Sequence, residues 1–126
     1  MKVLLAGCGG FLGSVARYLL GGWVQRLVQA PVFPFGTLVV NVSGCLAIGI
    51  LGGLADQRGL LSPGARVFLL TGVLGGYTTF SSFGYETLQL LRDGEAMPAL
   101  ANVLLQVALG LGAVWAGNAM TRLLWS

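Results

Sequence analysis

The sequence contains no histidine, and only 9% of its 126 residues are charged. Histidine is the side chain that most often serves as a general base, a proton relay or a metal ligand near neutral pH. The acidic residues begin only at Asp56, so the first part of the chain holds no carboxylate side chain either. These absences argue against enzymatic chemistry, and we expect the protein not to be an enzyme.

Strong positive charge is also missing. The net charge is +3, and the sequence has no basic run of the kind that binds nucleic acid, so we expect no nucleic-acid partner. Cysteine is scarce as well. Cys8 and Cys45 both lie in apolar stretches, which favours small buried side chains over a disulfide or a metal site.

Apolar residues make up 56% of the chain, and glycine contributes 21 residues. A membrane-spanning helix needs about 20 apolar residues, and stretches of that kind occur at residues 3–20, 36–55, 65–91 and 98–121. The composition therefore predicts an all-α, multi-pass membrane protein. Its four transmembrane helices are expected to form a single domain over residues 1–126.

The first span carries glycines in a pattern that has two interpretations. Gly7, Gly10 and Gly13 match the opening of a dinucleotide-binding fold, but that fold needs an acidic residue about 20 positions later, and none occurs there. We therefore interpret these glycines, together with Gly9, as a stripe of small residues that lets helices pack closely.

A single positive charge, Arg17, lies near the end of the first span. Its long side chain either extends to the membrane interface or faces a water-filled vestibule. Directly after it, residues 21–35 begin with Gly21-Gly22 and continue with Trp23, Arg26 and two prolines. This stretch predicts the end of the first helix and a turn at the interface.

Two spans carry small and polar residues at every fourth position, which places them along one side of a helix. The second span has Thr37, Asn41, Cys45, Gly49 and Gly53 in this register, and the fourth span has Asn102, Gln106 and Gly110. A buried amide such as that of Asn41 needs a hydrogen-bond partner. Its side chain either bonds to another helix or donates to a solvated path.

The third span is interrupted near its middle by TGVLGGYTTFSSFGYE, residues 71–86. Glycine reaches positive φ without strain, so Gly75-Gly76 are predicted to end a first half-helix, and Thr78 or Thr79 to cap the second half. Non-helical backbone at membrane depth is tolerated only where protein buries it or where it lines a cavity, so the break predicts a site. The alternative is a glycine hinge or a packing contact.

Polar residues continue along the second half of this span. Ser82 and Glu86 are four residues apart and therefore share one side of the helix. Glu86 lies close to the loop at residues 92–95. We expect its carboxylate to be solvated or paired rather than part of a permeation path.

An even number of spans places both chain termini on one side of the membrane. Outside the spans, Lys2, Arg58, Arg66 and Arg122 lie on that side, and Arg26 and Arg92 lie on the other. This bias is weak, so insertion in both orientations is allowed. No internal repeat is visible, and a symmetric partner for the broken helix must come from a second chain. We therefore expect an antiparallel, dual-topology homodimer.

Three segments of the chain resemble the fluoride channel family called Fluc or CrcB: GFLGSVARY at residues 10–18, GTLVVNVSG at 36–44 and GGYTTFSSF at 75–83. The resemblance extends over the whole chain. It implies a multi-pass protein of the cell inner membrane whose four-helix subunits pair antiparallel. In that family the dimer exports fluoride by passive permeation through two pathways, and a central sodium ion is held by backbone carbonyls.

The resemblance also implies roles for individual residues. By position in the motifs, the sodium ligands are the carbonyls of Gly75 and Thr78, and the anion pathway residues are Phe80, Phe83, Asn41 and Ser81. Further pathway or vestibule positions are Arg17, Thr37, Thr79, Ser82, Asn102 and Gln106. The last two depart from the family pattern, because many members have tyrosine and then serine at these places.

Elementary electrostatics agrees with this division of roles. The C-terminal end of a half-helix is a negative pole and favours a cation, and two copies of one break would bring four carbonyl oxygens together. An anion would instead meet hydroxyl and amide donors and the positive edges of the Phe80 and Phe83 rings.

Two other functions compete with this interpretation. A small dual-topology multidrug transporter has a similar length but needs a carboxylate in its first helix, where this chain has only Arg17. A non-conducting membrane assembly subunit would use the polar stripes only to pair helices.

Overall fold

The computed structural model describes residues 1–125, and within that range it consists of helices and short connections, without a strand. The helices are α1 (Lys2–Val28), α2 (Phe35–Arg58), α3 (Pro63–Arg66), the π-helical segment η1 (Val67–Leu74), α4 (Gly75–Tyr77), α5 (Phe80–Arg92) and α6 (Ala96–Leu124).

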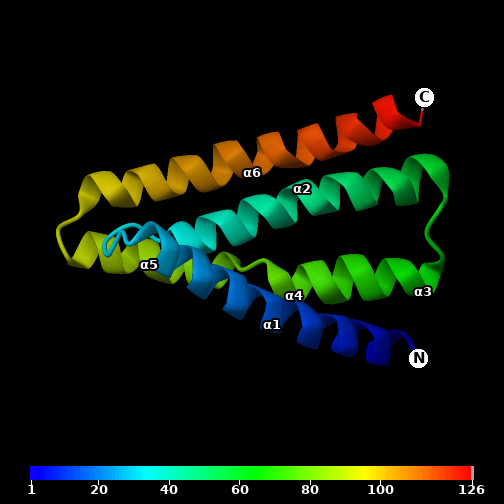
Figure 1. Ribbon diagram of the computed structural model, residues 1–126, viewed down its shortest axis with the longest axis horizontal. Coiled ribbons are helices and arrows are strands. Elements are labelled where there is room, and N and C mark those ends of the chain that lie inside the picture. The colour runs from blue at the N-terminus through cyan, green and yellow to red at the C-terminus, as the bar shows by residue number, and fades with distance from the viewer. Residues whose placement is uncertain (126) are drawn as a thin grey trace.

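Four of the helical stretches are long and apolar enough to cross a membrane: α1, α2, the run from α3 to α5, and α6. The predicted all-α class with four spans and a broken third helix is therefore confirmed. Figure 1 shows both termini at the same end of the molecule, as an even number of spans requires.

The first helix is longer than the sequence suggests. α1 continues past the expected span end near residue 20 to Val28 and is followed by Gln29, whose φ is 52°, so the predicted helix end and turn do fall within residues 21–35, but after Gly21-Gly22. The glycine pair serves packing instead. A Cβ atom added to Gly36 at the start of α2 would overlap the carbonyl oxygen of Gly21, so the two helices meet backbone to backbone at this point.

The predicted small-residue stripe of α1 is confirmed by its contacts with the third span. A Cβ atom on Gly9 would lie 2.9 Å from the Cα of Gly72, and a Cβ on Gly13 would overlap the Val73 carbonyl oxygen. Farther along, a Cβ on Gly76 would lie 2.9 Å from the Cα of Gly10. Glycines therefore let α1 lie directly against the backbone of η1 and α4.

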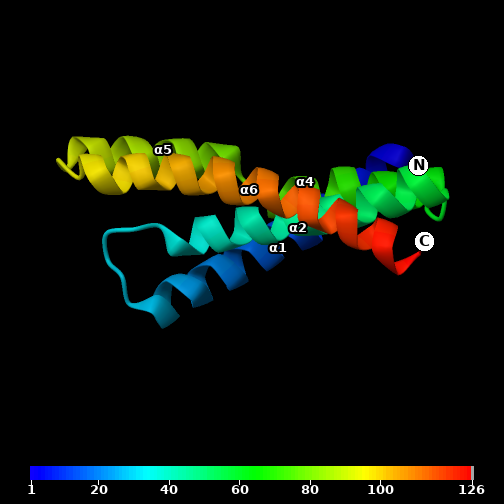
Figure 2. The same cartoon turned by 90° about the horizontal axis from the view of Figure 1, so that it is seen from above.

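A second glycine contact joins α2 to α6. Gly49 and Gly117 face the partner helix so closely that a Cβ on either would overlap a backbone carbonyl, of Val114 and Leu46 respectively. Beside them the buried Thr121 hydroxyl donates to the Ile50 carbonyl over 3.2 Å. In Figure 2, α5 and α6 run together along one side, and α1 with the loop into α2 lies on the other.

These contacts predict that one added methyl group in the α2–α6 contact destabilises the protein. Gly49→Ala should lower the free energy of unfolding by about 1–3 kcal/mol, because the new Cβ overlaps the Val114 carbonyl of a close-packed neighbour. Thermal unfolding in detergent would measure the change. The matched control is Gly52→Ala in the same helix, where an added Cβ meets no atom within 4 Å. Equal melting temperatures for the two variants would contradict the packing account.

Candidate functional site at the helix break

The break in the third span consists of two residues in extended conformation. Thr78 has φ −81° and ψ 155°, and Thr79 has φ −149° and ψ 106°. The predicted break at Gly75-Gly76 is therefore placed too early, since both glycines are helical and Gly75 has φ −61°. Gly76 is required for a different reason, namely the close approach of the Gly10 backbone.

The half-helix before the break contains a π-helical segment that the sequence did not predict. A π-helix is defined by hydrogen bonds that span five residues, and such segments occur often at functional sites. The apolar run Val67–Leu74 offers no residue pattern that separates this pairing from an ordinary α-helical one. At the break itself, the Thr78 hydroxyl donates to the Leu74 carbonyl over 3.0 Å.

The half-helix after the break is capped by Thr79. Its hydroxyl oxygen accepts a hydrogen bond from the Ser82 N–H at 3.2 Å and also donates to the Ser82 hydroxyl at 2.9 Å. Of the two threonines predicted as the cap, Thr79 is thus the one that fills the role. The Ser81 hydroxyl lies 3.3 Å from that of Thr79, and Ser81 itself is exposed.

Asn41 of α2 holds the break through both atoms of its side-chain amide. Its Nδ2 donates to the Thr79 carbonyl over 3.0 Å, and its Oδ1 accepts from the Thr79 N–H over 2.7 Å. The same nitrogen donates to Gln106 Oε1 of α6 over 3.1 Å. The predicted helix-to-helix hydrogen bond is therefore present. Three separate spans meet at this one side chain.

A cavity of about 340 Å³ opens beside this junction. The residues that line it include Asn41, Thr78, Thr79 and Gln106, together with Phe80 and Phe83. The two ring centroids are 5.5 Å apart, so the predicted shared face of these phenylalanines is confirmed. Phe80 is 84% exposed in the single chain.

A second, more polar cavity of about 490 Å³ lies between α1, the loop into α2, and α5. It is lined by Arg17, Thr37, Thr79, Ser82 and Glu86, among others. Of the two positions considered for Arg17, the structure favours the vestibule, because its Nη1 points at the Thr78 carbonyl from 3.4 Å. Thr79 lines both cavities and stands between them.

Three polar side chains near these cavities, Glu86, Asn102 and Gln106, each have one hydrogen-bonded atom and one buried atom without a partner among the residues that the structure describes. Thr37 donates to Glu86 Oε1 over 2.8 Å, so the carboxylate has a hydrogen-bond partner, and it lines the second cavity. That Glu86 takes no part in permeation stays a prediction. Asn102 is fully buried and donates to the Thr87 hydroxyl over 3.0 Å. Within residues 1–125, Glu86 Oε2, Asn102 Oδ1 and Gln106 Nε2 are buried without a hydrogen-bond partner.

The backbone at the break fits a small cation better than side chains do. No group of three His, Cys, Asp or Glu residues that could hold a metal occurs in the described part of the chain. The Thr79 N–H, which would bind the Gly75 carbonyl in a continuous helix, donates to Asn41 instead. Gly75 is also exposed on the surface of the chain. The Gly75 carbonyl thus lacks its usual helical partner, and the Thr78 carbonyl accepts the long hydrogen bond from Arg17.

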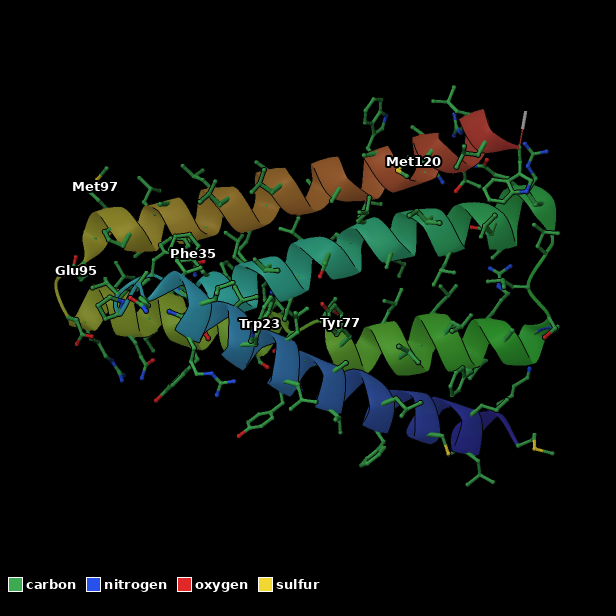
Figure 3. All side chains as sticks on the ribbon, in the orientation of Figure 1. Trp23, Phe35, Tyr77, Glu95, Met97 and Met120 are labelled. Carbon is green, nitrogen blue, oxygen red and sulfur yellow. The ribbon has the colours of Figure 1, made fainter. Side chains whose placement is uncertain are left out.

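Tyr77, directly before the break, forms a hydrogen bond with α2. It is labelled in Figure 3 at the end of α4, and its hydroxyl lies 2.7 Å from that of Ser43 on α2. Behind it, a Cβ atom on Gly44 would overlap the Thr78 methyl group. The extended residues are therefore held against α2 by packing as well as by the Asn41 amide.

Known proteins are similar in sequence to this chain over nearly its full length. The family model described as CrcB-like protein, Camphor Resistance (CrcB), matches residues 4–118. The Fluoride-specific ion channel FluC of Solibacter usitatus (strain Ellin6076) is 52% identical over 97% of this chain and 99% of its own length. The protein of the same name from Rhizobium meliloti (strain 1021) is 49% identical over 95% of each chain. The chain belongs to the CrcB-like family.

Proposed function

We propose that this protein is a fluoride channel of the cell inner membrane, which lets fluoride leave the cell by passive permeation. The observation that carries the proposal is the polar break at membrane depth, flanked by two cavities, in a chain about half identical to proteins named fluoride-specific ion channels. A chain without histidine and with few carboxylates offers no catalytic alternative at this site.

The pathway runs from the second cavity to the first. The positive charge of Arg17 attracts an anion into the vestibule, where the Ser82 hydroxyl replaces part of its water. Thr37 lines the same vestibule with its hydroxyl bonded to Glu86.

Beyond Thr79 the anion passes the edges of the Phe80 and Phe83 rings, which carry the positive end of the ring quadrupole. Gln106, which lines the first cavity, is a further polar position of this route. Ser81 and Asn102 line neither of the two cavities, and their place on the route rests on the family resemblance.

The complete channel is an antiparallel homodimer. Gly75, Phe80 and Ser81 flank the break and are exposed on the single chain, which supports a partner surface there. A two-fold axis in the membrane plane would bring two breaks together and create two pathways.

A structural sodium ion is proposed at this axis, held by the Gly75 and Thr78 carbonyls of both chains. Backbone oxygens at the negative, C-terminal end of a half-helix suit a hard cation. The bilayer offers no water that could take the place of the ion. The Gly75 carbonyl, released from the Thr79 N–H, supports this assignment.

The two phenylalanines provide a test of the pathway. Phe80→Ile or Phe83→Ile should reduce fluoride efflux from liposomes by about tenfold or more, equivalent to about 1.4 kcal/mol of lost stabilisation, because isoleucine fills space but has no ring edge. Phe11→Ile is the control, since Phe11 is exposed on α1 and lies outside both cavities. Efflux equal to that of the wild type, from a folded dimer, would show that the rings only pack.

Dual topology predicts labelling from both sides of the membrane. In a variant without Cys8 and Cys45, a cysteine replacing Asp93 in the exposed loop between α5 and α6 should react with an impermeant reagent in about half of the molecules. Opening the cells should expose the other half. Labelling of all molecules, or of none, from the outside would exclude the antiparallel dimer.

The sodium site predicts that prolonged removal of sodium abolishes efflux or separates the dimer. Restoring sodium, but not the larger potassium ion, should recover both, because four carbonyl oxygens replace the hydration shell of an ion of one size. Efflux and size-exclusion elution would be followed in parallel. An intact, fully active dimer after exhaustive dialysis would remove sodium from the proposal.

A further inference from the structure

The connection between α1 and α2 has few hydrogen-bond donors of its own. It covers residues 29–34 and includes Pro31 and Pro34, which have no N–H to donate. The N-cap of α2 is Pro34, which has no side chain that could accept a hydrogen bond. The first N–H groups of a helix have no partner inside the helix, so the start of α2 needs an acceptor from elsewhere.

Gln25, half-buried in the last turn of α1, supplies these partners. Its Nε2 donates to the Ala30 carbonyl over 2.7 Å and to the Phe33 carbonyl over 3.0 Å. Its Oε1 accepts from the Gly36 N–H over 3.0 Å. These partners fix the orientation of the amide, because a reversed amide would set its oxygen against two carbonyls. Gln25 therefore ties both the connection and the start of α2 to α1.

The same connection forms part of the wall of the second cavity, the vestibule. Residues 31–34 and Gln25 line this cavity of about 490 Å³, as do Arg17, Ser82 and Glu86. Figures 1 and 2 show the connection at the end of the molecule opposite the termini. The hydrogen bonds of Gln25 thus hold one wall of the vestibule in place.

These bonds also cover the negative ends of two peptide groups. Without Gln25, the carbonyl oxygens of Ala30 and Phe33 would need other donors and would repel an anion that approaches them. A cleft that carries one sign of charge raises the local concentration of the opposite ion. Arg17 supplies positive charge in the vestibule, and two uncovered carbonyls would offset part of its attraction.

We propose that Gln25 is a positioning residue of the vestibule, whose amide holds the connection at residues 29–34 in place and so sets how readily fluoride enters. This inference rests on the proposed channel function. Gln25 lines the second cavity but not the first, so its effect falls on entry rather than on passage along the phenylalanine rings.

The test separates entry from conduction by following efflux from liposomes over a range of internal fluoride concentrations. Gln25→Met removes all three hydrogen bonds while keeping a flexible, unbranched side chain. The fluoride concentration at half-maximal efflux should rise about threefold or more, with the maximal rate within about twofold of the wild type. A purely structural loss would instead lower the number of working channels, and with it the maximal rate, at an unchanged half-maximal concentration.

A second variant and a second measurement follow the connection itself. Gln25→Glu keeps an acceptor for the Gly36 N–H but loses both donors and adds a negative charge, so it should raise the half-maximal concentration further. A spin label on Val32→Cys, in a protein without Cys8 and Cys45, reports on the position of the exposed connection. The label should become more mobile in both Gln25 variants. If Gln25→Met does not give a folded dimer, Gln25→Glu carries the same test.

Gln57→Met is the matched control, because Gln57 also donates through its amide, to Asn118 Oδ1 over 3.1 Å, but lines neither cavity. It should change neither the half-maximal concentration nor the mobility of the label. An unchanged half-maximal concentration in the Gln25 variants, or a label as immobile as in the wild type, would overturn the positioning role. A wild type that passes no fluoride would instead overturn the proposed function and the entry role with it, whereas the label would still decide whether Gln25 holds the connection.

Discussion

The structure depends on one unfavourable feature that has been made tolerable: two extended residues in the middle of a helix in an apolar medium. Each unpaired backbone group there would cost several kcal/mol, so the break persists only because other spans satisfy it. Asn41 pairs with Thr79 from α2, Thr79 caps α5 through Ser82, and Gly10 of α1 lets the Gly76 backbone approach. The remaining helices act as the support of this short segment.

Much of this arrangement follows from residue patterns. The four spans are readable because membrane helices are long, apolar and locally hydrogen bonded, and the stripes at Gly9–Gly13 and Gly49–Gly53 mark the helix contacts because only small residues allow such approach. The phenylalanine pair is equally local, since residues three apart on one helix share a face. These features need information from only a few neighbouring positions.

The features that sequence reasoning missed are those that two elements decide together. Gly21-Gly22 looks like a helix end, but the contact with Gly36 makes it a packing site. The break lies at Thr78-Thr79 rather than Gly75-Gly76, because the Asn41 amide captures the Thr79 N–H, and no local pattern encodes that distant bond. The link from Asn41 to Gln106 is likewise invisible along the chain. The roles of the ion ligands and pathway residues stay predictions.

The exposure of Gly75 and Phe80 has a consequence for how the protein would respond to dilution. One side of the broken span packs against glycines of α1, whereas the other side is exposed to the surroundings of the single chain. If a second copy covers that side, only the dimer conducts, and the amount of dimer depends on the concentration of the protein in the membrane. The fraction of working channels would then fall with the protein-to-lipid ratio, and overproduction and scarcity would change flux more than proportionally.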